Sequence, residues 1–241
     1  MTKLSVNVNK IATLRNSRGG DEPNLMNLVH KIIGYGAEGI TVHPRADQRH
    51  ITRQDAIDVA EQVKSVETNF EGDLREDFLD LTVKMKPTQC TLVPVNFGEV
   101  TSNHGWDVLK NDYILEAVIN KIKNNGTRVS LFIDVGNFKG IEKAAELGAD
   151  RIEIYTEPYA DAFKLGDYKN ELKLIKETVK IASQFGLMSN AGHDLTHANL
   201  PPLVGEIPEI AEVSIGHHII SYALEVGLEK SIKDHLDALK K

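Results

Sequence analysis

The stretch Gly39-Ile40-Thr41-Val42-His43-Pro44-Arg45-Ala46-Asp47-Gln48-Arg49-His50-Ile51 connects an apolar segment to a loop that carries two histidines and two arginines. Apolar and polar side chains alternate up to His43, and this period of two predicts a strand. Pro44 ends the strand because proline has no backbone N–H to give to a sheet. A helix is predicted from about Arg53. The cations of the intervening loop favour a phosphorylated substrate, and a solvated turn with surface charges is the alternative interpretation.

The same order of strand and helix repeats along the chain. Segments with strand character occupy residues 4–8, 40–43, 68–70, 90–93, 129–133, 151–155, 187–191 and 213–215. Helical spacing of apolar residues is found at 25–33, 74–83, 114–122, 141–147 and 172–185, and in a C-terminal segment rich in Leu and Lys. Residues 36–43 and 148–155 also resemble each other, as expected of two equivalent helix-turn-strand units in one closed sheet.

Eight strands with helical connections predict an α/β protein with a (β/α)8 TIM barrel fold. The chain has 241 residues, close to the ~250 typical of such a barrel, and no linker divides it, so residues 1–241 are predicted to form a single domain. An open doubly wound sheet is the alternative. It is disfavoured because no G-x-G-x-x-G follows the first strand.

Composition excludes several partners and compartments. The net charge of −7 comes from 35 acidic and 28 basic residues spread along the chain, which argues against nucleic acid or an anionic membrane as the main partner. The only cysteine, Cys90, rules out an internal disulfide and is interpreted as filler in an apolar strand. We find no signal-peptide pattern in the first residues and no apolar run of ~18 residues, so we expect a soluble, cytoplasmic protein.

Polar and charged residues gather at the carboxyl ends of the predicted strands. They are Asn7, Asn9, Lys10, Arg15 and Arg18 after the first strand, His43 after the second, Glu71 after the third, Thr101 in the loop after the fourth, Glu153 within the sixth, His193 after the seventh, and Gly216 and His217 after the eighth. Barrel enzymes carry their chemistry at this end. Two histidines and two carboxylates in one pocket would suit several proton transfers in sequence.

Two features sharpen this picture. Glu153 lies between Ile152 and Ile154, so its carboxylate points into the barrel if the isoleucines pack against helices; a structural carboxylate paired with an arginine is the alternative. The last two strands end in residues 190–193 (NAGH) and 214–217 (SIGH). Phosphate is commonly bound at this place by backbone N–H groups, and glycine permits its close approach.

Other site types lack support. Nine histidines are present, but none falls in an H-E-x-x-H or Cys-rich arrangement. His217 and His218 are adjacent, so on an extended backbone they would point apart. We therefore expect no metal. The sequence also contains neither a G-x-S-x-G elbow for a Ser-His-Asp triad nor a Walker motif.

Five motifs carry a resemblance to a known family. They are VNVNKIATLRNSRG at residues 6–19, GITVHPR at 39–45 with RHI at 49–51, SLFID at 130–134, NAGH at 190–193 and IGH at 215–217. Their order and their spread over the whole chain resemble pyridoxine 5′-phosphate synthases. The resemblance implies a barrel enzyme with extra helices that assembles as a homo-octamer built from dimers. It further implies condensation of 3-amino-2-oxopropyl phosphate with 1-deoxy-D-xylulose 5-phosphate to pyridoxine 5′-phosphate, phosphate and water, with no metal or organic cofactor.

The resemblance also implies a role for each site residue. His43 and Glu71 match the family's proton acceptors, His193 its proton donor and Glu153 its transition-state stabiliser. Asn7, Arg18, Asp194, Gly216 and His217 match positions that hold the amino-oxopropyl phosphate, and Asn9, Lys10, Arg45, His50 and Thr101 match those that hold deoxyxylulose phosphate.

Three departures leave two other hypotheses open. Most family members carry Asp-His where this chain has Asn9-Lys10, Gly where it has Asp194, and Glu where it has Val95. Asp194 would repel a phosphate unless its side chain turns away. One alternative is a Schiff-base aldolase with Lys10 as nucleophile, and the other is a phosphate-binding barrel that has lost activity through the Asn9-Lys10 change.

Overall fold

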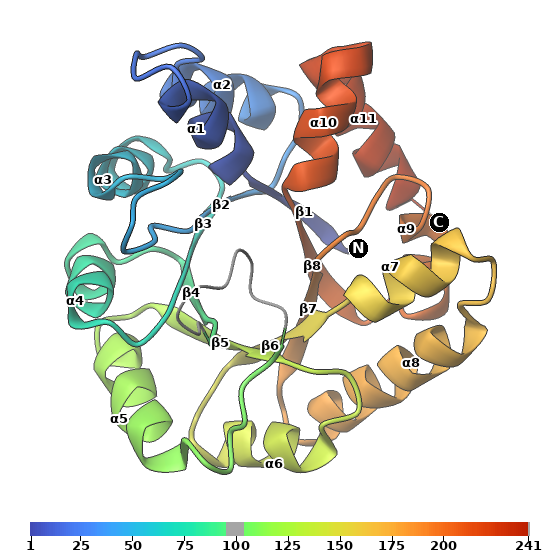
Figure 1. Cartoon of the computed structure of the whole chain (residues 1–241). Helices are drawn as coiled ribbons and strands as arrows, with labels where there is room; N and C mark the ends of the chain where they lie inside the picture. The colour runs from blue at the N-terminus through green and yellow to red at the C-terminus, as the bar shows by residue number, and fades with distance from the viewer. Residues whose placement is uncertain (95–103, 241) are drawn as a thin grey trace.

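The chain forms a closed barrel of eight parallel strands surrounded by helices, as the sequence predicts (Figure 1). The computed structural model describes residues 1–94 and 104–240. The strands are β1 (Lys3–Asn7), β2 (Gly39–Val42), β3 (Glu67–Gly72), β4 (Gln89–Leu92), β5 (Arg128–Ile133), β6 (Arg151–Tyr155), β7 (Met188–Gly192) and β8 (Ile210–Ile215). Each strand pairs with its neighbours in chain order, and β1 closes the ring against β8.

The helices lie outside this ring and cover its outer face (Figure 1). They are α1 (Asn9–Asn16), α2 (Leu25–Gly34), α3 (Arg53–Gln62), α4 (Glu76–Met85), α5 (Asp112–Lys123), α6 (Phe138–Glu146), α7 (Glu157–Lys164), α8 (Lys169–Gln184), α9 (Leu200–Glu206), α10 (His217–Val226) and α11 (Leu228–Ala238). Within the described part of the chain, no helix combines the length and the apolar character needed to cross a membrane.

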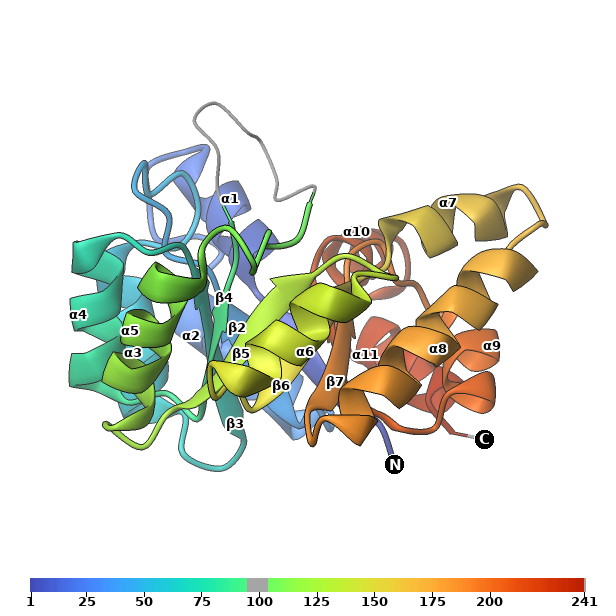
Figure 2. The same cartoon turned by 90° about the horizontal axis from the view of Figure 1, so that it is seen from below.

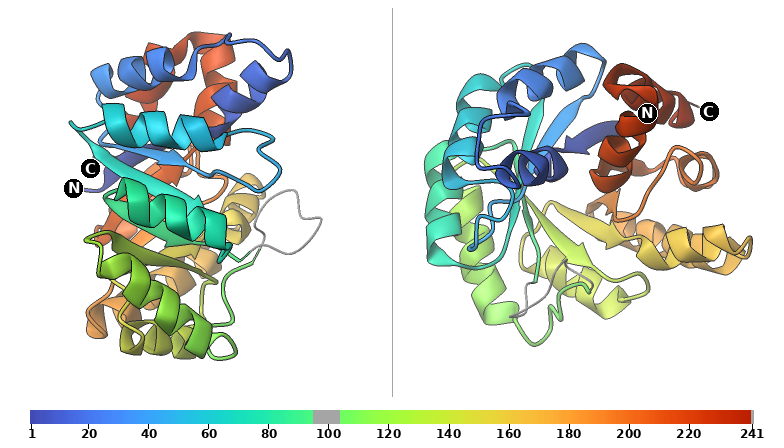
Figure 3. Two further views of the ribbon diagram at one scale, coloured as in Figure 1. Left: turned by 90° about the vertical axis from the view of Figure 1, so that its left-hand side faces the viewer. Right: turned by 45° about the horizontal axis from the view of Figure 1, so that its top comes forward.

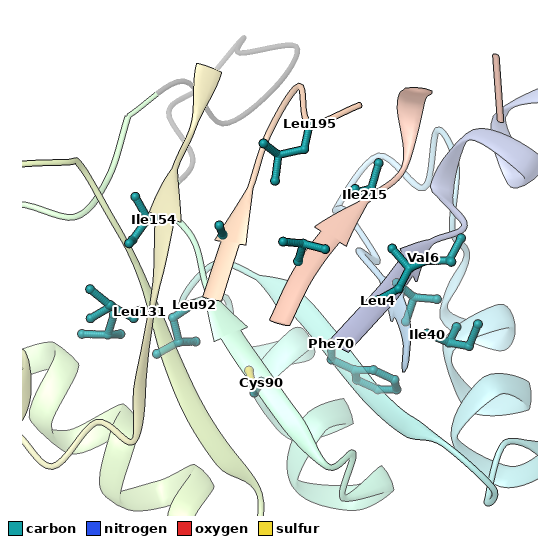
Figure 4. Packing of buried hydrophobic residues seen from close by; sticks show 14 of the residues in the cluster. Leu4, Val6, Ile40, Phe70, Cys90, Leu92, Leu131, Ile154, Leu195 and Ile215 are labelled. Atoms are coloured by element: carbon teal, nitrogen blue, oxygen red, sulfur yellow. The ribbon is translucent and has the colours of Figure 1, made fainter. Parts of the chain in front are cut away.

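Apolar side chains fill the layer between strands and helices. Leu131, Ile154 and Leu92 point outward from β5, β6 and β4 into this layer, together with Cys90 (Figure 4). Each fully buried side chain of this size contributes about 1.5–3 kcal/mol to folding. Cys90 is therefore a core residue, and burial raises the pKa of its thiol.

The inside of the barrel is polar. Ser5 and Thr41 lie 2.8 Å apart, Thr91 donates to Asn69, and Arg151 donates to Asn190. These side chains are buried, and each hydrogen bond offsets the cost of removing a polar group from water. The resulting network forms the floor beneath the strand ends.

The helices differ from the sequence prediction near both ends of the chain, and α7 and α9 were not predicted either. Residues 9–16, expected as loop after the first strand, form α1, and its buried Arg15 makes a bidentate ion pair with Asp55 of α3. Arg15 is thus structural. The single C-terminal helix is really two, because Gly227 adopts φ +87° between α10 and α11; this left-handed conformation favours glycine and ends a helix.

The two ends of the barrel are surrounded by different helices and chain segments. Figure 2 shows α1, α7 and α10 at one end and both chain termini at the other, and Figure 3 shows the termini close together. The carboxyl ends of the strands face α1 and α10, since these helices follow β1 and β8 directly. This end is therefore where the predicted site residues gather.

Candidate active site

A pocket of about 620 Å³ lies at the carboxyl ends of the strands. The predicted site residues that line it are Asn7, Asn9, Lys10, His43, Arg45, His50, Glu71, Glu153, His193, Asp194, Gly216 and His217. Arg18 is exposed beyond the end of α1 and does not line the pocket. Thr101 and Val95 lie outside the described residues.

His43 and Glu71 form the centre of this pocket. His43 follows β2 directly, and Glu71 lies within β3 rather than after it. The imidazole Nδ1 is 3.9 Å from Oε2 of the carboxyl, to which Asn7 donates through Nδ2 at 3.3 Å. Burial lowers the pKa of His43, and the charges of His50 and Arg45 lower it further. Burial also raises the pKa of Glu71 to about 8, with a smaller contribution from the charge of Glu212.

Glu153 points inward from β6, as its two flanking isoleucines predict. Ile152 and Ile154 belong to the outer apolar layer, while the carboxyl lines the pocket with Oε2 3.4 Å from Oγ1 of Thr91. Burial raises the pKa of Glu153 well above its ordinary value, and the charges of Glu71 and Glu212 raise it further. In the described residues Glu153 forms no ion pair with an arginine, so the structural-pair interpretation has no support.

His193 follows β7 in a left-handed backbone conformation, φ +84°. Its ring contacts Phe132 and Tyr155, with centroid distances of 5.4 and 5.0 Å. Burial lowers its pKa, which the charge of Asp194 partly opposes. Asp194 is itself left-handed, φ +54°, and exposed. Glycine adopts this conformation most easily, and aspartate is among the few other residues that tolerate it.

The loop after β2 supplies the cations that the sequence predicts. Arg45 and Arg49 line the pocket with His50, whose Nδ1 accepts a hydrogen bond from the N–H of Ile51 at 2.9 Å. Burial lowers the pKa of His50 to about 4, with the two arginines adding to the effect. At neutral pH the ring is therefore neutral and carries its proton on Nε2. This N–H is a donor for an anionic group.

A second anion-binding feature is the start of α10. Gly216 is the N-cap, and no side chain caps the first N–H groups of this helix. A Cβ at Gly216 would lie 3.0 Å from the backbone oxygen of Asn7, so glycine lets β8 and β1 approach each other here. Free N–H groups at a helix N-terminus bind phosphate well.

The structure adds pocket residues that sequence reasoning did not identify. Glu157 opens α7, and its pKa is raised by burial first and then by Asp194 and Asp161. Phe132 forms part of the wall beside His193. Phe132 belongs to the SLFID motif, but the sequence assigns it no role. The helix that carries Glu157 is not predicted from the sequence. A Thr-Glu-Pro sequence at 156–158, typical of a helix start, was the available signal.

Fold and site together indicate a TIM-barrel enzyme that acts on small phosphorylated molecules. Residues 4–241 match the family model described as "Pyridoxal phosphate biosynthesis protein PdxJ". The chain belongs to this family. Curated relatives named pyridoxine 5′-phosphate synthase are 50% identical in Christiangramia forsetii and 46% in Flavobacterium johnsoniae, each over the full length of both chains. A third, from Xanthomonas axonopodis pv. citri, is 47% identical and covers 99% of this chain and 97% of its own.

Solved structures with low sequence identity share the fold alone. Thiamine phosphate pyrophosphorylase from Pyrococcus furiosus superposes with a TM-score of 0.60 at 12% identity, over 98% of this chain and 95% of its own. 3-Keto-L-gulonate-6-phosphate decarboxylase from Vibrio cholerae gives a TM-score of 0.64 at 8% identity, over 99% and 97%. These matches support the barrel architecture.

Proposed function

We propose that this chain is a pyridoxine 5′-phosphate synthase that condenses 3-amino-2-oxopropyl phosphate with 1-deoxy-D-xylulose 5-phosphate, releasing pyridoxine 5′-phosphate, phosphate and water. The observation that carries the proposal is the meeting of His43, Glu71, Glu153 and His193 in one pocket beside a cationic loop. The named relatives support it. The reaction needs no metal or organic cofactor, because proton transfers suffice for each step.

The roles of His43 and Glu71 follow from which of the two side chains carries a proton at neutral pH. Joining an amine to a ketone, dehydrating the product and closing a ring all require groups that exchange protons repeatedly. His43 is neutral before the substrate binds, so it can accept a proton. Glu71 holds a proton before the substrate binds, and the ammonium group of the amino-oxopropyl substrate lowers its pKa on arrival, so that it becomes a second acceptor. By the resemblance to the family, His193 is the proton donor, for which the negative charge of a bound phosphate raises its pKa, and Glu153 is the transition-state stabiliser.

Two groups of residues hold the phosphorylated substrates. Arg45, His50 and Lys10 bind deoxyxylulose phosphate, and Asn9 positions it from the start of α1. The N-terminus of α10, with Gly216 and His217, binds the amino-oxopropyl phosphate together with Asn7 and the loop at Asp194. Arg18 and Thr101 complete these two sets. Positioning two substrates against each other removes a large entropic barrier.

Assembly and location complete the proposal. By its resemblance to the family, the chain forms a homo-octamer built from dimers and works in the cytoplasm. Size-exclusion chromatography with light scattering tests the assembly. A mass of one or two chains would contradict it.

The decisive experiment is an assay of the purified protein with both substrates, following pyridoxine 5′-phosphate and released phosphate. Product from both substrates together, and from neither alone, is expected. Borohydride trapping of a substrate on Lys10 would instead favour the aldolase, and binding without turnover would favour an inactive barrel. The aldolase is disfavoured because Lys10 is exposed on α1, whereas reactive lysines are commonly desolvated.

A further inference from the structure

Three histidines without a role in the proposed reaction meet beside the pocket, which His218 also lines. His197 lies in the turn after β7, His218 in the first turn of α10 and His235 in α11. One ring nitrogen of each lies within 4.8 Å of the other two. Nδ1 of His197 and Nε2 of His218 are 3.1 Å apart and share a hydrogen bond, which a bound metal ion would replace. The sequence argument that His217 and His218 point apart assumed an extended backbone, and this condition is not met because both residues are helical.

His235 supplies the most informative atom of this cluster. The residue is fully buried, and its Nδ1 lies 2.7 Å from the backbone oxygen of Ser231. A carbonyl oxygen only accepts hydrogen bonds, so Nδ1 carries the proton and a neutral ring keeps a lone pair on Nε2. This Nε2 has no hydrogen-bond partner among the described residues. A buried acceptor left unsatisfied costs about 1–3 kcal/mol, and the ring centroid of His235 lies 5.2 Å from that of His218 and 5.6 Å from that of His197.

The same arrangement is typical of a metal ligand. Histidines that bind metals usually donate their second ring N–H to a backbone carbonyl or carboxylate, which fixes the tautomer. In tetrahedral zinc sites with Zn–N bonds of 2.0–2.1 Å, ligand nitrogens lie about 3.3 Å apart. The 3.1 Å separation between His197 and His218 is close to this value, and a ring nitrogen of His235 lies within 4.8 Å of both.

The surroundings hold the rings in place and keep them neutral. Tyr222 stacks on His197 with a centroid distance of 4.6 Å, and its hydroxyl donates to Asp234 at 2.9 Å. Burial lowers the pKa of His235 to about 4, and the nearby His218 and His197 add to the effect. Burial and His197 likewise lower the pKa of His218. Neutral imidazoles are the form that binds Zn²⁺, Cu²⁺ or Ni²⁺.

We propose that His197, His218 and His235 bind a divalent transition-metal ion, Zn²⁺ in the first place, with water in the fourth position. The ion ties the loop after β7 to α10 and α11. His193 lies four residues before His197 on that loop, so the metal also braces the segment that carries the proposed proton donor. The site is separate from the reaction chemistry.

Calorimetric titration of the chelator-treated full-length protein with Zn²⁺ tests the proposal. One ion per chain is expected to bind. Loss of a residue that only hydrogen-bonds to a metal ligand already costs 10–100-fold in metal affinity. Loss of a ligand itself, in His197→Ala or His235→Phe, should therefore weaken Zn²⁺ binding by ~100-fold or more. Should His235→Phe fail to fold, His197→Ala carries the test, since His197 is only half-buried in a turn.

Two controls assign the ion to this cluster. His30→Ala removes an exposed histidine of α2 and should leave binding unchanged. Glu157→Gln alters the other group of candidate ligands, Glu157, His193 and Asp194, and should also leave it unchanged. Zinc-edge anomalous diffraction should place the ion between the three rings. Absence of Zn²⁺ binding, unchanged affinity in His197→Ala, or loss of binding in Glu157→Gln would overturn the proposal and leave a stack of rings that only packs the helices.

Discussion

Nδ1 of His43 lies 3.9 Å from Oε2 of Glu71, at the point where β2 and β3 end side by side. Both side chains are buried. Burial disfavours charge on each, so the pKa of the imidazole is lowered and that of the carboxyl is raised. At neutral pH the pair is therefore a free base beside a protonated acid. Such a pair can accept and return protons as the substrate changes its own charge.

The first prediction concerns turnover. Glu71→Gln and His193→Ala should each reduce kcat by ~10²-fold or more, the usual contribution of a general acid or base. Glu71→Gln keeps the shape of the side chain, and circular dichroism should confirm an intact barrel in both variants. Glu38→Gln, at an exposed position, is the matched control. Near-normal turnover in either variant would remove that residue from the mechanism.

The second prediction concerns stability against pH. The pKa of Glu71 is raised by burial to about 8 in the folded state, against ~4.3 in the unfolded chain. Between these values the folded protein keeps a proton that the unfolded chain has lost. The contribution of Glu71 to stability is complete below its pKa in the unfolded chain. It is lost as pH rises toward and through its pKa in the folded protein, at about 1.4 kcal/mol per pH unit.

Urea unfolding at pH 5.5 and 7.5 measures this effect. The free energy of unfolding of wild type should fall by about 2 kcal/mol more than that of Glu71→Gln between the two values. The buried histidines act in the opposite direction below about pH 6.5, and comparison of the two proteins cancels their contribution. Equal pH dependence in both proteins would show that Glu71 titrates near its ordinary pKa.

The third prediction uses the contact between Gly192 and Glu153. A Cβ at Gly192 would lie 2.4 Å from Oε1 of Glu153, and the backbone there is held because Gly192 O accepts hydrogen bonds from Thr156 N and Oγ1 at 2.9 and 2.6 Å. The carboxyl must therefore move. Misplacement by about 1 Å can cost 10²-fold in rate, so Gly192→Ala should reduce kcat/KM by ~10²-fold.

Gly205→Ala is the control for this experiment. Among the described residues, no atom outside the backbone of its own helix lies within 4 Å of the added Cβ, and alanine stabilises a helix by about 0.5–1 kcal/mol relative to glycine. Gly205→Ala should thus keep full activity and gain stability. Unchanged kinetics in Gly192→Ala would show that the position of Glu153 is not critical.

Periodicity was sufficient for the barrel and for the direction of Glu153. Alternation along β6 placed two isoleucines outward, and a closed sheet leaves the residue between them only the interior. Strand ends were predicted only to within a few residues. Hydrogen bonding to the neighbouring strands decides where each strand ends, and the sequence pattern does not show it. The short helices α1, α7 and α9 were missed, because each has too few residues for a clear period of 3.6.

The site was recovered less completely, for a physical reason. Residues at strand ends come together whenever the barrel closes, so His43, Glu71 and His193 could be grouped from sequence position alone. The grouping of His197, His218 and His235 depends on how a turn and two helices pack, and no linear spacing encodes it. Arg15 looked like a site cation, but its place on α1 directs it to Asp55.

The last prediction concerns positions 9 and 10, where this chain carries an amide and an ammonium. Oδ1 of Asn9 accepts a hydrogen bond from the backbone N–H of His43 at 3.0 Å, a contact that an aspartate oxygen also makes. Lys10 lines the pocket from an exposed position on α1, where its charge attracts phosphate in both the ground state and the transition state. Lys10→Ala should therefore raise KM for deoxyxylulose phosphate several-fold and change kcat much less, the pattern of lost uniform binding. The double variant Asn9→Asp with Lys10→His should stay active, because it keeps the contact with His43 and a donor at position 10. Steady-state kinetics with the second substrate saturating separate the two constants, and loss of kcat in Lys10→Ala would place Lys10 in the chemistry itself.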